Sequence, residues 1–135
     1  MSETELSQIN PSTKAKVLLE ALPYVQKFRD SLFVVKYGGS FLDEDNLEMQ
    51  QLVATDIVFL ASVGIRVALV HGGGKSITRA LAEGGISTRF VNGLRYTDEA
   101  SIEVVERTLN TEVNEKICQT IEAAGGIPAP TRGQR

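Results

Sequence analysis

The sequence predicts an α/β protein with an open, mainly parallel sheet between helices and one β-hairpin. Short apolar runs alternate with longer segments in which apolar residues recur every three or four positions, as strands and helices do. Two of the apolar runs end in glycine-rich turns. The dipeptide Asn92-Gly93 separates two further short segments and is typical of a hairpin turn. Strands that alternate with helices favour parallel pairing outside this hairpin.

The chain begins with residues 1–11, which are polar and are expected to form a disordered tail. Residues 12–30 have helical periodicity, and Ser12 is the predicted amino-terminal cap. Pro23 lies inside this segment. Because proline lacks an N–H and its ring crowds the preceding turn, we expect a kink or break there.

The next run, at 31–37, contains consecutive apolar residues and is predicted to be a buried strand. The elements predicted after it are a helix at 47–63, a strand at 66–70, a helix at 75–83, hairpin strands at 86–91 and 94–97, and a long helix that starts at 98 and ends before 125. Asp98 is the predicted cap of the long helix. Residues 127–135 contain two prolines and no periodicity, so they are expected to form an atypical tail.

Composition argues against several classes of protein. The 14 basic and 17 acidic residues give a net charge of −3, which argues against a dedicated nucleic-acid binder. No apolar run is long enough to cross a bilayer, and the first ten residues lack the apolar core of a signal peptide. The single cysteine, Cys118, excludes an intrachain disulfide. We therefore expect a cytoplasmic protein with no nucleic-acid partner and no membrane partner.

The two glycine-rich turns, at 36–40 and 71–75, are the strongest indication of a binding site. Ligands of open α/β sheets bind beyond the carboxyl ends of the strands. Glycines there let backbone N–H groups approach an anion, and the helix predicted to follow the second turn adds its dipole. The pattern favours a cradle for phosphate or carboxylate. The alternative is a pair of tight strand-to-helix turns without a ligand.

The common nucleotide and metal motifs do not fit. The phosphate-loop pattern requires glycine at the position of Leu69, and the dinucleotide pattern requires glycine at the position of Ile77. No spacing of histidine, cysteine or acidic residues indicates a metal site. The cradle is therefore expected to contact something other than a nucleotide first.

Three side chains near these turns have two interpretations each. Lys36 can place its ammonium among phosphate oxygens, or extend from the strand end into solvent. Arg95, just after the hairpin turn, can grip a carboxylate with its planar guanidinium, although a solvated hairpin arginine is the interpretation that the sequence alone favours. His71 can act as a base or brace the turn with a hydrogen bond, and bracing is favoured.

Four strings in order resemble the N-acetylglutamate kinases of the amino-acid kinase superfamily. They are ALPYV at 21–25, VKYGGS at 35–40, VHGGG at 70–74 and NGLRYTD at 92–98. The resemblance covers roughly residues 14–126. It implies ATP-dependent phosphorylation of the side-chain carboxylate of N-acetyl-L-glutamate, a step of arginine biosynthesis, with ATP as co-substrate together with Mg²⁺. It also implies the fold of an amino-acid kinase-like amino-terminal lobe, here truncated.

The resemblance assigns roles residue by residue. Lys36 is similar to the lysine that stabilises the transferring phosphoryl group, and Gly39 resembles a glycine whose amide faces that group; these are the expected catalytic positions. Gly73 and Gly74 match the substrate-binding glycine pair, and the Gly73 amide also resembles one that faces the phosphoryl group. Arg95 matches the arginine that holds the α-carboxylate of the substrate.

The resemblance also implies an assembly and an organisation. The helix at 12–30 resembles the kinked helix that links dimers into a hexamer in arginine-inhibited members, so a homo-oligomer and an arginine effector are expected, with Tyr24 as a possible allosteric contributor. Residues 31–126 resemble the substrate-binding lobe. The tail at 127–135 does not resemble the strand expected there, so the ATP-binding lobe that the resemblance implies is expected to be absent. The chain is therefore expected to be the amino-terminal half only, an incomplete fragment that is inactive by itself.

Two other functions remain open. The chain could be a lobe of a sister amino-acid kinase that acts on carbamate, aspartate or a nucleoside monophosphate. It could also be a non-catalytic module that binds acidic metabolites, or binds a partner chain through its first helix.

Overall fold

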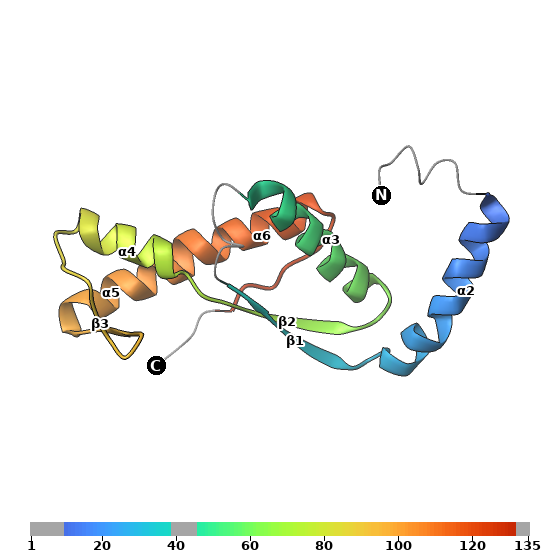
Figure 1. The fold of residues 1–135 in the computed structure, drawn as a ribbon, viewed down its shortest axis with the longest axis horizontal. Coiled ribbons are helices and arrows are strands. Elements are labelled where there is room, and N and C mark those ends of the chain that lie inside the picture. Colours follow the sequence, from blue (N-terminus) through green and yellow to red (C-terminus); the bar gives the residue numbers. More distant parts are fainter. Residues whose placement is uncertain (1–9, 39–45, 132–135) are drawn as a thin grey trace.

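The computed structural model describes residues 10–38 and 46–131, and it confirms the predicted α/β class (Figure 1). The elements in chain order are α2 (Pro11–Phe28), β1 (Leu32–Tyr37), α3 (Leu47–Ser62), β2 (Arg66–His71), α4 (Gly74–Glu83), β3 (Arg89–Val91), β4 (Leu94–Tyr96), α5 (Glu99–Arg107), the π-helical segment η3 (Thr108–Val113) and α6 (Asn114–Ala123). Helix α2 and the hairpin lie at opposite ends of the molecule, with the parallel strands between them.

The two apolar strands pair as predicted. Strands β1 and β2 are parallel, in a register that runs from Leu32 opposite Arg66 to Tyr37 opposite His71, and α3 makes the crossover between them. Strands β3 and β4 form the antiparallel hairpin. At its turn, Asn92 has a φ of 51° and Gly93 a φ of 79°. Positive values at both central residues are the geometry for which Asn-Gly is favoured, so the hairpin prediction is confirmed.

The core lies on the side of the sheet that faces α3 and α6. Its centre is formed by Tyr37, Val113 and Ile117, and partly buried residues of α3, β2 and α6 pack against them. Strand β1, which was predicted to be buried, is covered on this side only. On its other side, Leu32 is 58% exposed and Val34 is 67% exposed. Alternate side chains of a strand point to opposite faces, so the exposure of these two follows from one open face of β1.

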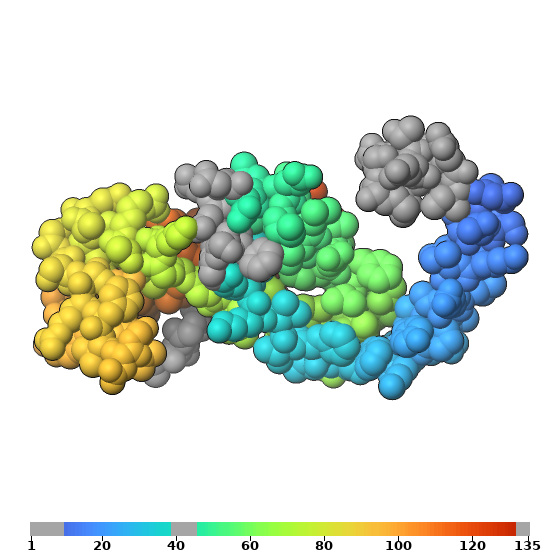
Figure 2. Space-filling model, in the orientation of Figure 1, coloured from blue at the N-terminus to red at the C-terminus, as the bar shows by residue number. Residues whose placement is uncertain are grey.

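Helix α2 begins differently from the prediction. Asn10, and not Ser12, is the cap: its Oδ1 accepts a hydrogen bond of 2.8 Å from the Ser12 backbone N–H, and Pro11 occupies the first turn, where the missing N–H costs nothing. Pro23 lies inside the helix without ending it. The helix has no buried residue, and Figure 2 shows it projecting from the body of the molecule.

The predicted long helix starts as expected but contains an irregular segment. The Asp98 carboxylate accepts a hydrogen bond of 2.9 Å from the Ser101 N–H, and Ser101 Oγ accepts one of 2.8 Å from the Asp98 N–H. This reciprocal capping box confirms the predicted cap. The helix then passes through the π-helical segment η3 before α6. Such segments occur mostly as single turns inside α-helices, often at functional sites.

Parts of the sequence prediction fall outside the described residues. These are the polar tail before Asn10, the catalytic position Gly39 and the end of the carboxyl-terminal tail after Thr131. Within the described ranges, no helix combines the length and the apolar character that crossing a membrane requires.

Candidate functional site

The start of the first glycine turn, at Gly38, lies beside the second turn, at Gly72. The Gly72 N–H donates a hydrogen bond of 3.2 Å to the Tyr37 carbonyl, which extends the parallel pairing by one step. A Cβ on Gly38 would lie 3.9 Å from the Gly72 nitrogen. Lys36 is exposed, is paired with Val70 and comes one residue before this junction. Its ammonium is therefore carried to the carboxyl end of the sheet, where ligands of such sheets bind.

His71 braces the second turn. Its Nδ1 lies 3.1 Å from the Gly72 carbonyl oxygen. Because a carbonyl oxygen only accepts, Nδ1 must carry the proton in this hydrogen bond. The bracing hydrogen bond favoured from the sequence is therefore found in the structure.

Gly73 is required by packing, whereas its neighbours face open space. An added Cβ on Gly73 would lie 2.8 Å from Leu109 Cδ2 and 3.1 Å from Val113 Cγ2 of η3. No atom lies within 4 Å of the corresponding position on Gly72 or Gly74. The turn thus rests against η3 on one side and is open on the other, so its backbone is held in place and accessible at the same time.

Helix α4 begins at this turn. Gly73 is its amino-terminal cap residue, and the Ile77 N–H donates to the Gly73 carbonyl at 2.8 Å, which closes the first turn of the helix. The first N–H groups of a helix have no partner within the helix, and the helix dipole makes this end favourable for an anion. Ile77 and Leu81 are buried and fix α4 in place.

Arg95 reaches from β4 to the start of α4. Its Nη2 donates to Thr78 Oγ1 at 2.7 Å and to the Gly74 carbonyl at 3.1 Å, and its Nη1 donates to Thr88 Oγ1 at 3.2 Å. Its Cζ lies 4.9 Å from the centre of the Phe90 ring, its partner in the hairpin register. Arg95 is half-buried. The solvated hairpin arginine that the sequence alone favoured is therefore wrong.

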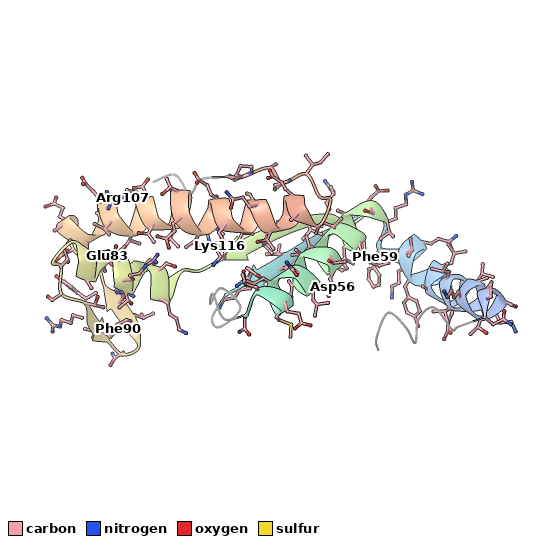
Figure 3. All side chains as sticks on the ribbon, turned by 90° about the horizontal axis from the view of Figure 1, so that it is seen from above. Asp56, Phe59, Glu83, Phe90, Arg107 and Lys116 are labelled. Carbon is pink, nitrogen blue, oxygen red and sulfur yellow. The ribbon has the colours of Figure 1, made fainter. Side chains whose placement is uncertain are left out.

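The charge of Arg95 is not balanced by these contacts, because all three acceptors and the aromatic ring are neutral. Arg79, which lies on α4, differs from Arg95 because its charge is paired. It forms an ion pair with Glu112 of η3 and lies 4.0 Å from Glu83. Figure 3 shows Glu83 and Phe90 at the same end of the molecule. Arg95 thus offers positive charge beside the glycine turn, and Arg79 holds α4 against η3.

The structure therefore brings most, but not all, of the predicted site residues together. Gly73, Gly74 and Arg95 are directly connected, whereas Lys36 is linked to the turn only by backbone, through its neighbour Tyr37, whose carbonyl accepts from the Gly72 N–H. Tyr24 lies on α2, is 65% exposed, and is at the opposite end of the molecule from the hairpin.

The sequence did not point to the threonines that bind Arg95 or to the π-helical segment behind Gly73. Thr78 could have been suggested weakly by its spacing, because it lies one helical turn after Gly74 and therefore on the same side of α4. Thr88 lies in the loop before β3 and has no signal in the sequence. The position of η3 depends on its contact with a distant glycine, which periodicity does not report.

Glycine amides, the amino end of α4 and Lys36 suit a phosphate group. Within the residues that the structure describes, no group of three histidine, cysteine or acidic side chains could hold a metal ion such as Mg²⁺. These residues therefore suit an anionic group, a phosphate or a carboxylate.

A separate hollow of about 750 Å³ lies along β2, α3, α6 and residues 125–131. Its lining is largely apolar, and it includes Cys118 and His71 but none of Lys36, Gly73, Gly74 and Arg95. Burial, together with the nearby negative charges of Glu122 and Glu115, raises the pKa of the Cys118 thiol. This thiol is therefore held in its less reactive neutral form, as expected for a packing residue. No lysine, arginine or acidic residue is among the described residues that line this hollow.

Known proteins show the same pattern of sequence. The model of the amino acid kinase family matches residues 31–132. The acetylglutamate kinase of Synechococcus sp. (strain JA-2-3B'a(2-13)) is 48% identical over 126 residues, which cover 93% of this chain and 40% of that protein. The acetylglutamate kinase of Gloeobacter violaceus is 49% identical over 118 residues, which cover 87% of this chain and 38% of that protein. The chain thus spans about two fifths of the length of these curated relatives.

Solved structures show a related fold. The N-acetylglutamate synthase of Neisseria gonorrhoeae, complexed with coenzyme A and N-acetyl-glutamate, matches with a TM-score of 0.56 and 31% identity, over 79% of this chain and 23% of that chain. The same synthase complexed with coenzyme A and L-arginine matches with a TM-score of 0.53 and 30% identity, over 85% of this chain and 26% of that chain. Because the family match extends over residues 31–132 of the 135, the chain belongs to the amino acid kinase family.

Proposed function

We propose that this chain forms the N-acetyl-L-glutamate-binding part of an acetylglutamate kinase. The observation that carries the proposal is the position of Arg95, whose unbalanced positive charge lies 3.1 Å from the Gly74 carbonyl, beside the open glycine turn. The curated relatives named acetylglutamate kinase support the choice of substrate. So does the related synthase that was solved with N-acetyl-glutamate.

The reaction of the whole enzyme would join two anions. An oxygen of the side-chain carboxylate attacks the γ-phosphorus of ATP, and the bond from that phosphorus to the β-phosphate oxygen breaks, which leaves an acyl phosphate and ADP. The repulsion between the two anions must be offset by cations and by backbone N–H groups aimed at the transferring group. We assign Lys36 and the Gly39 and Gly73 amides to this group, and Gly73, Gly74 and Arg95 to the amino-acid substrate.

Substrate binding, and not turnover, is the direct test, because the chain spans about two fifths of the length of its relatives. Calorimetry of the chain with N-acetyl-L-glutamate should show binding at one site. Arg95→Ala should weaken it by about ten- to a hundredfold, since hydrogen bonds to a charged group are worth about 1.5–3 kcal/mol. Arg79→Ala is the matched control, because Arg79 is already paired with Glu112, and it should bind as the wild type does.

The same titration separates the alternatives. Preferred binding of carbamate, aspartate or a nucleoside monophosphate would assign the chain to a sister kinase. Binding of N-acetyl-L-glutamate that is unchanged in Arg95→Ala would remove the residue on which the proposal depends. No binding of any of these ligands would favour a non-catalytic module that binds a partner chain through its first helix.

Assembly is a second part of the proposal. Helix α2 exposes Val17, Leu18, Leu19, Leu22 and Tyr24 by 44–71%, and it buries none of its residues. Apolar surface of this kind on a projecting helix is typical of an interaction site. We assign α2 to the contact between copies in a homo-oligomer, a dimer linked into a hexamer. The related synthase was solved with L-arginine, which supports arginine as an effector, with Tyr24 contributing.

Sedimentation tests the assembly. The wild-type chain should sediment as an oligomer, and Leu18→Glu, which introduces charge into the exposed apolar row, should sediment as a smaller species. Lys14→Glu on the same helix is the control and should leave the size unchanged. Equal sizes for the wild type and Leu18→Glu would contradict the assignment.

We also place the protein in the cytoplasm, where thiols such as Cys118 stay reduced, and we expect no nucleic-acid partner, in view of the net charge of −3.

A further inference from the structure

The hydroxyl of Thr78 lies at the centre of a closed network. Its Oγ1 donates to the Gly74 carbonyl at 2.8 Å and accepts from Arg95 Nη2 at 2.7 Å, while the same Nη2 donates to the Gly74 carbonyl at 3.1 Å. Because the single hydroxyl proton is directed to Gly74, the oxygen lone pairs of Thr78 are directed to Arg95. The guanidinium and the backbone of the glycine turn are thus held by one side chain.

Thr88 holds the other end of the guanidinium. Its Oγ1 accepts from Nη1 at 3.2 Å, and the Phe90 ring lies against the guanidinium, 4.9 Å from Cζ. Contacts from α4, from the loop before β3 and from β3 itself therefore fix the plane of Arg95. These contacts are made by Nη1 and Nη2, whereas arginine has five N–H groups in all. Among the described residues, the other N–H groups of Arg95 have no recorded acceptor, so they can hold a carboxylate oxygen.

We propose that Thr78 and Thr88 are positioning residues that aim Arg95 at the α-carboxylate of the substrate. The proposal rests on the proposed function and goes beyond it by assigning a task to two residues that do not themselves bind the substrate. A long arginine side chain loses rotamer freedom when it grips a ligand, and this cost is smaller when the side chain is already held. Removing either hydroxyl should therefore weaken binding of the carboxylate through Arg95.

Thr78 has a close structural match elsewhere in the chain. Thr55 is an exposed helical threonine whose Oγ1 donates to the Gln51 carbonyl at 2.8 Å, the same bond to the preceding turn that Thr78 makes. Thr55 lies on α3 and has no arginine among its recorded partners. Thr55→Ala therefore reproduces the loss of this helix bond without touching Arg95.

The experiment measures the dissociation constant of N-acetyl-L-glutamate for the 135-residue chain by calorimetry. We expect Thr78→Ala to raise it by about three- to tenfold, the effect of one hydrogen bond, and Thr88→Ala to raise it by about threefold, since its bond is longer. Thr78→Ser, which keeps the hydroxyl, should recover most of the affinity. Thr55→Ala should leave the affinity unchanged.

A readout at Arg95 itself separates positioning from a general structural effect. In the wild type the Nη2 amino group of Arg95 should rotate slowly about the Cζ–Nη2 bond, because two hydrogen bonds hold it, and in Thr78→Ala NMR should show this rotation several times faster. In an Arg95→Ala background, adding Thr78→Ala should change the dissociation constant no further, because the proposed task of Thr78 is to hold Arg95.

The outcomes distinguish this inference from the proposed function. If the wild type binds, Arg95→Ala weakens binding and Thr78→Ala does not, the positioning role is refuted and the proposed function stands. If Thr78→Ala and Thr55→Ala weaken binding equally, the effect belongs to the helices and the role is again refuted. A wild-type chain that fails to bind N-acetyl-L-glutamate overturns the proposed function and this role together.

Discussion

Replacing Gly73 by alanine should destabilise the chain, because the new methyl group has no space. It would lie 2.8 Å from Leu109 Cδ2 and 3.1 Å from Val113 Cγ2, whereas carbon atoms prefer separations of about 3.5–4.0 Å. The backbone at Gly73 has a φ of −174°, which is outside the left-handed region that favours glycine. The cost is therefore steric and comes from η3, not from the conformation of the turn.

The magnitude follows from three effects. An extra methyl group in a packed region costs about 1–3 kcal/mol, and replacing glycine returns about 0.4–1 kcal/mol because the unfolded chain is less flexible. Leu109 is half-buried and can turn its methyl group away. Val113 is only 5% exposed and is branched at Cβ, so it cannot turn away easily. We expect the free energy of unfolding to fall by about 1–2 kcal/mol.

Urea denaturation followed by circular dichroism measures this change. Gly74→Ala is the matched control, because no atom lies within 4 Å of its added methyl group, and it should be as stable as the wild type or slightly more stable. In a Leu109→Ala background, Gly73→Ala should cost about 1 kcal/mol less than it does alone, since the closest contact is gone. A Gly73→Ala chain as stable as the Gly74→Ala chain would refute the argument that Gly73 is required by its packing on η3.

Three further predictions concern other parts of the chain. Gly126→Ala should lower the free energy of unfolding by about 2–3 kcal/mol, more than Gly73→Ala does. Its added methyl group would lie 2.6 Å from Ile121 Cγ2 and 2.8 Å from Val58 Cγ2. Urea denaturation compares the two variants, and equal stability of the two would contradict the prediction. Hydrogen bonds from the Ser101 side chain and N–H lower the pKa of Asp98, so the stability that this carboxylate contributes is present above the ordinary carboxyl pKa and is lost as the pH falls through its lower folded value. In Ser101→Ala, the pKa of Asp98 measured by NMR should move back toward the ordinary value. An unchanged pKa would exclude the Ser101 side chain as the cause. Burial raises the pKa of the Cys118 thiol, so iodoacetamide at pH 8 should alkylate it several times more slowly in the folded chain than in urea. Mass spectrometry measures both rates, and equal rates would mean that the thiol is not shielded.

The order of the elements could be predicted from the sequence because it depends on local signals. Apolar periodicity, the Asn92-Gly93 turn and the Asp98 cap each act within a few residues, and each is found where it was predicted. The first cap was misplaced, since Asn10 and Ser12 are both good caps and the choice depends on Pro11, which fits the first turn of the helix. Here two local signals competed, and the proline decided between them.

The features that the sequence could not supply depend on contacts between distant segments. Leu109 and Val113 are four residues apart, which suits a regular α-helix, and the π-helical segment that contains them becomes apparent only with Gly73 packed against it. The partial burial of Arg95 likewise depends on Thr78 and Thr88, which precede it by 17 and 7 residues. Leu32 and Val34 were predicted to be buried because they are apolar, but the side of the strand on which they lie is open.

The position of the substrate is the central claim, and an NMR titration of the ¹⁵N-labelled chain with N-acetyl-L-glutamate tests it directly. The account predicts that the largest shifts occur together, at the amides of Gly72, Gly73 and Gly74, at Lys36 and at the Arg95 side chain, and that they saturate with one dissociation constant. Shifts confined to the residues that line the hollow along β2, α3 and α6, with the glycine turn and Arg95 unchanged, would contradict it.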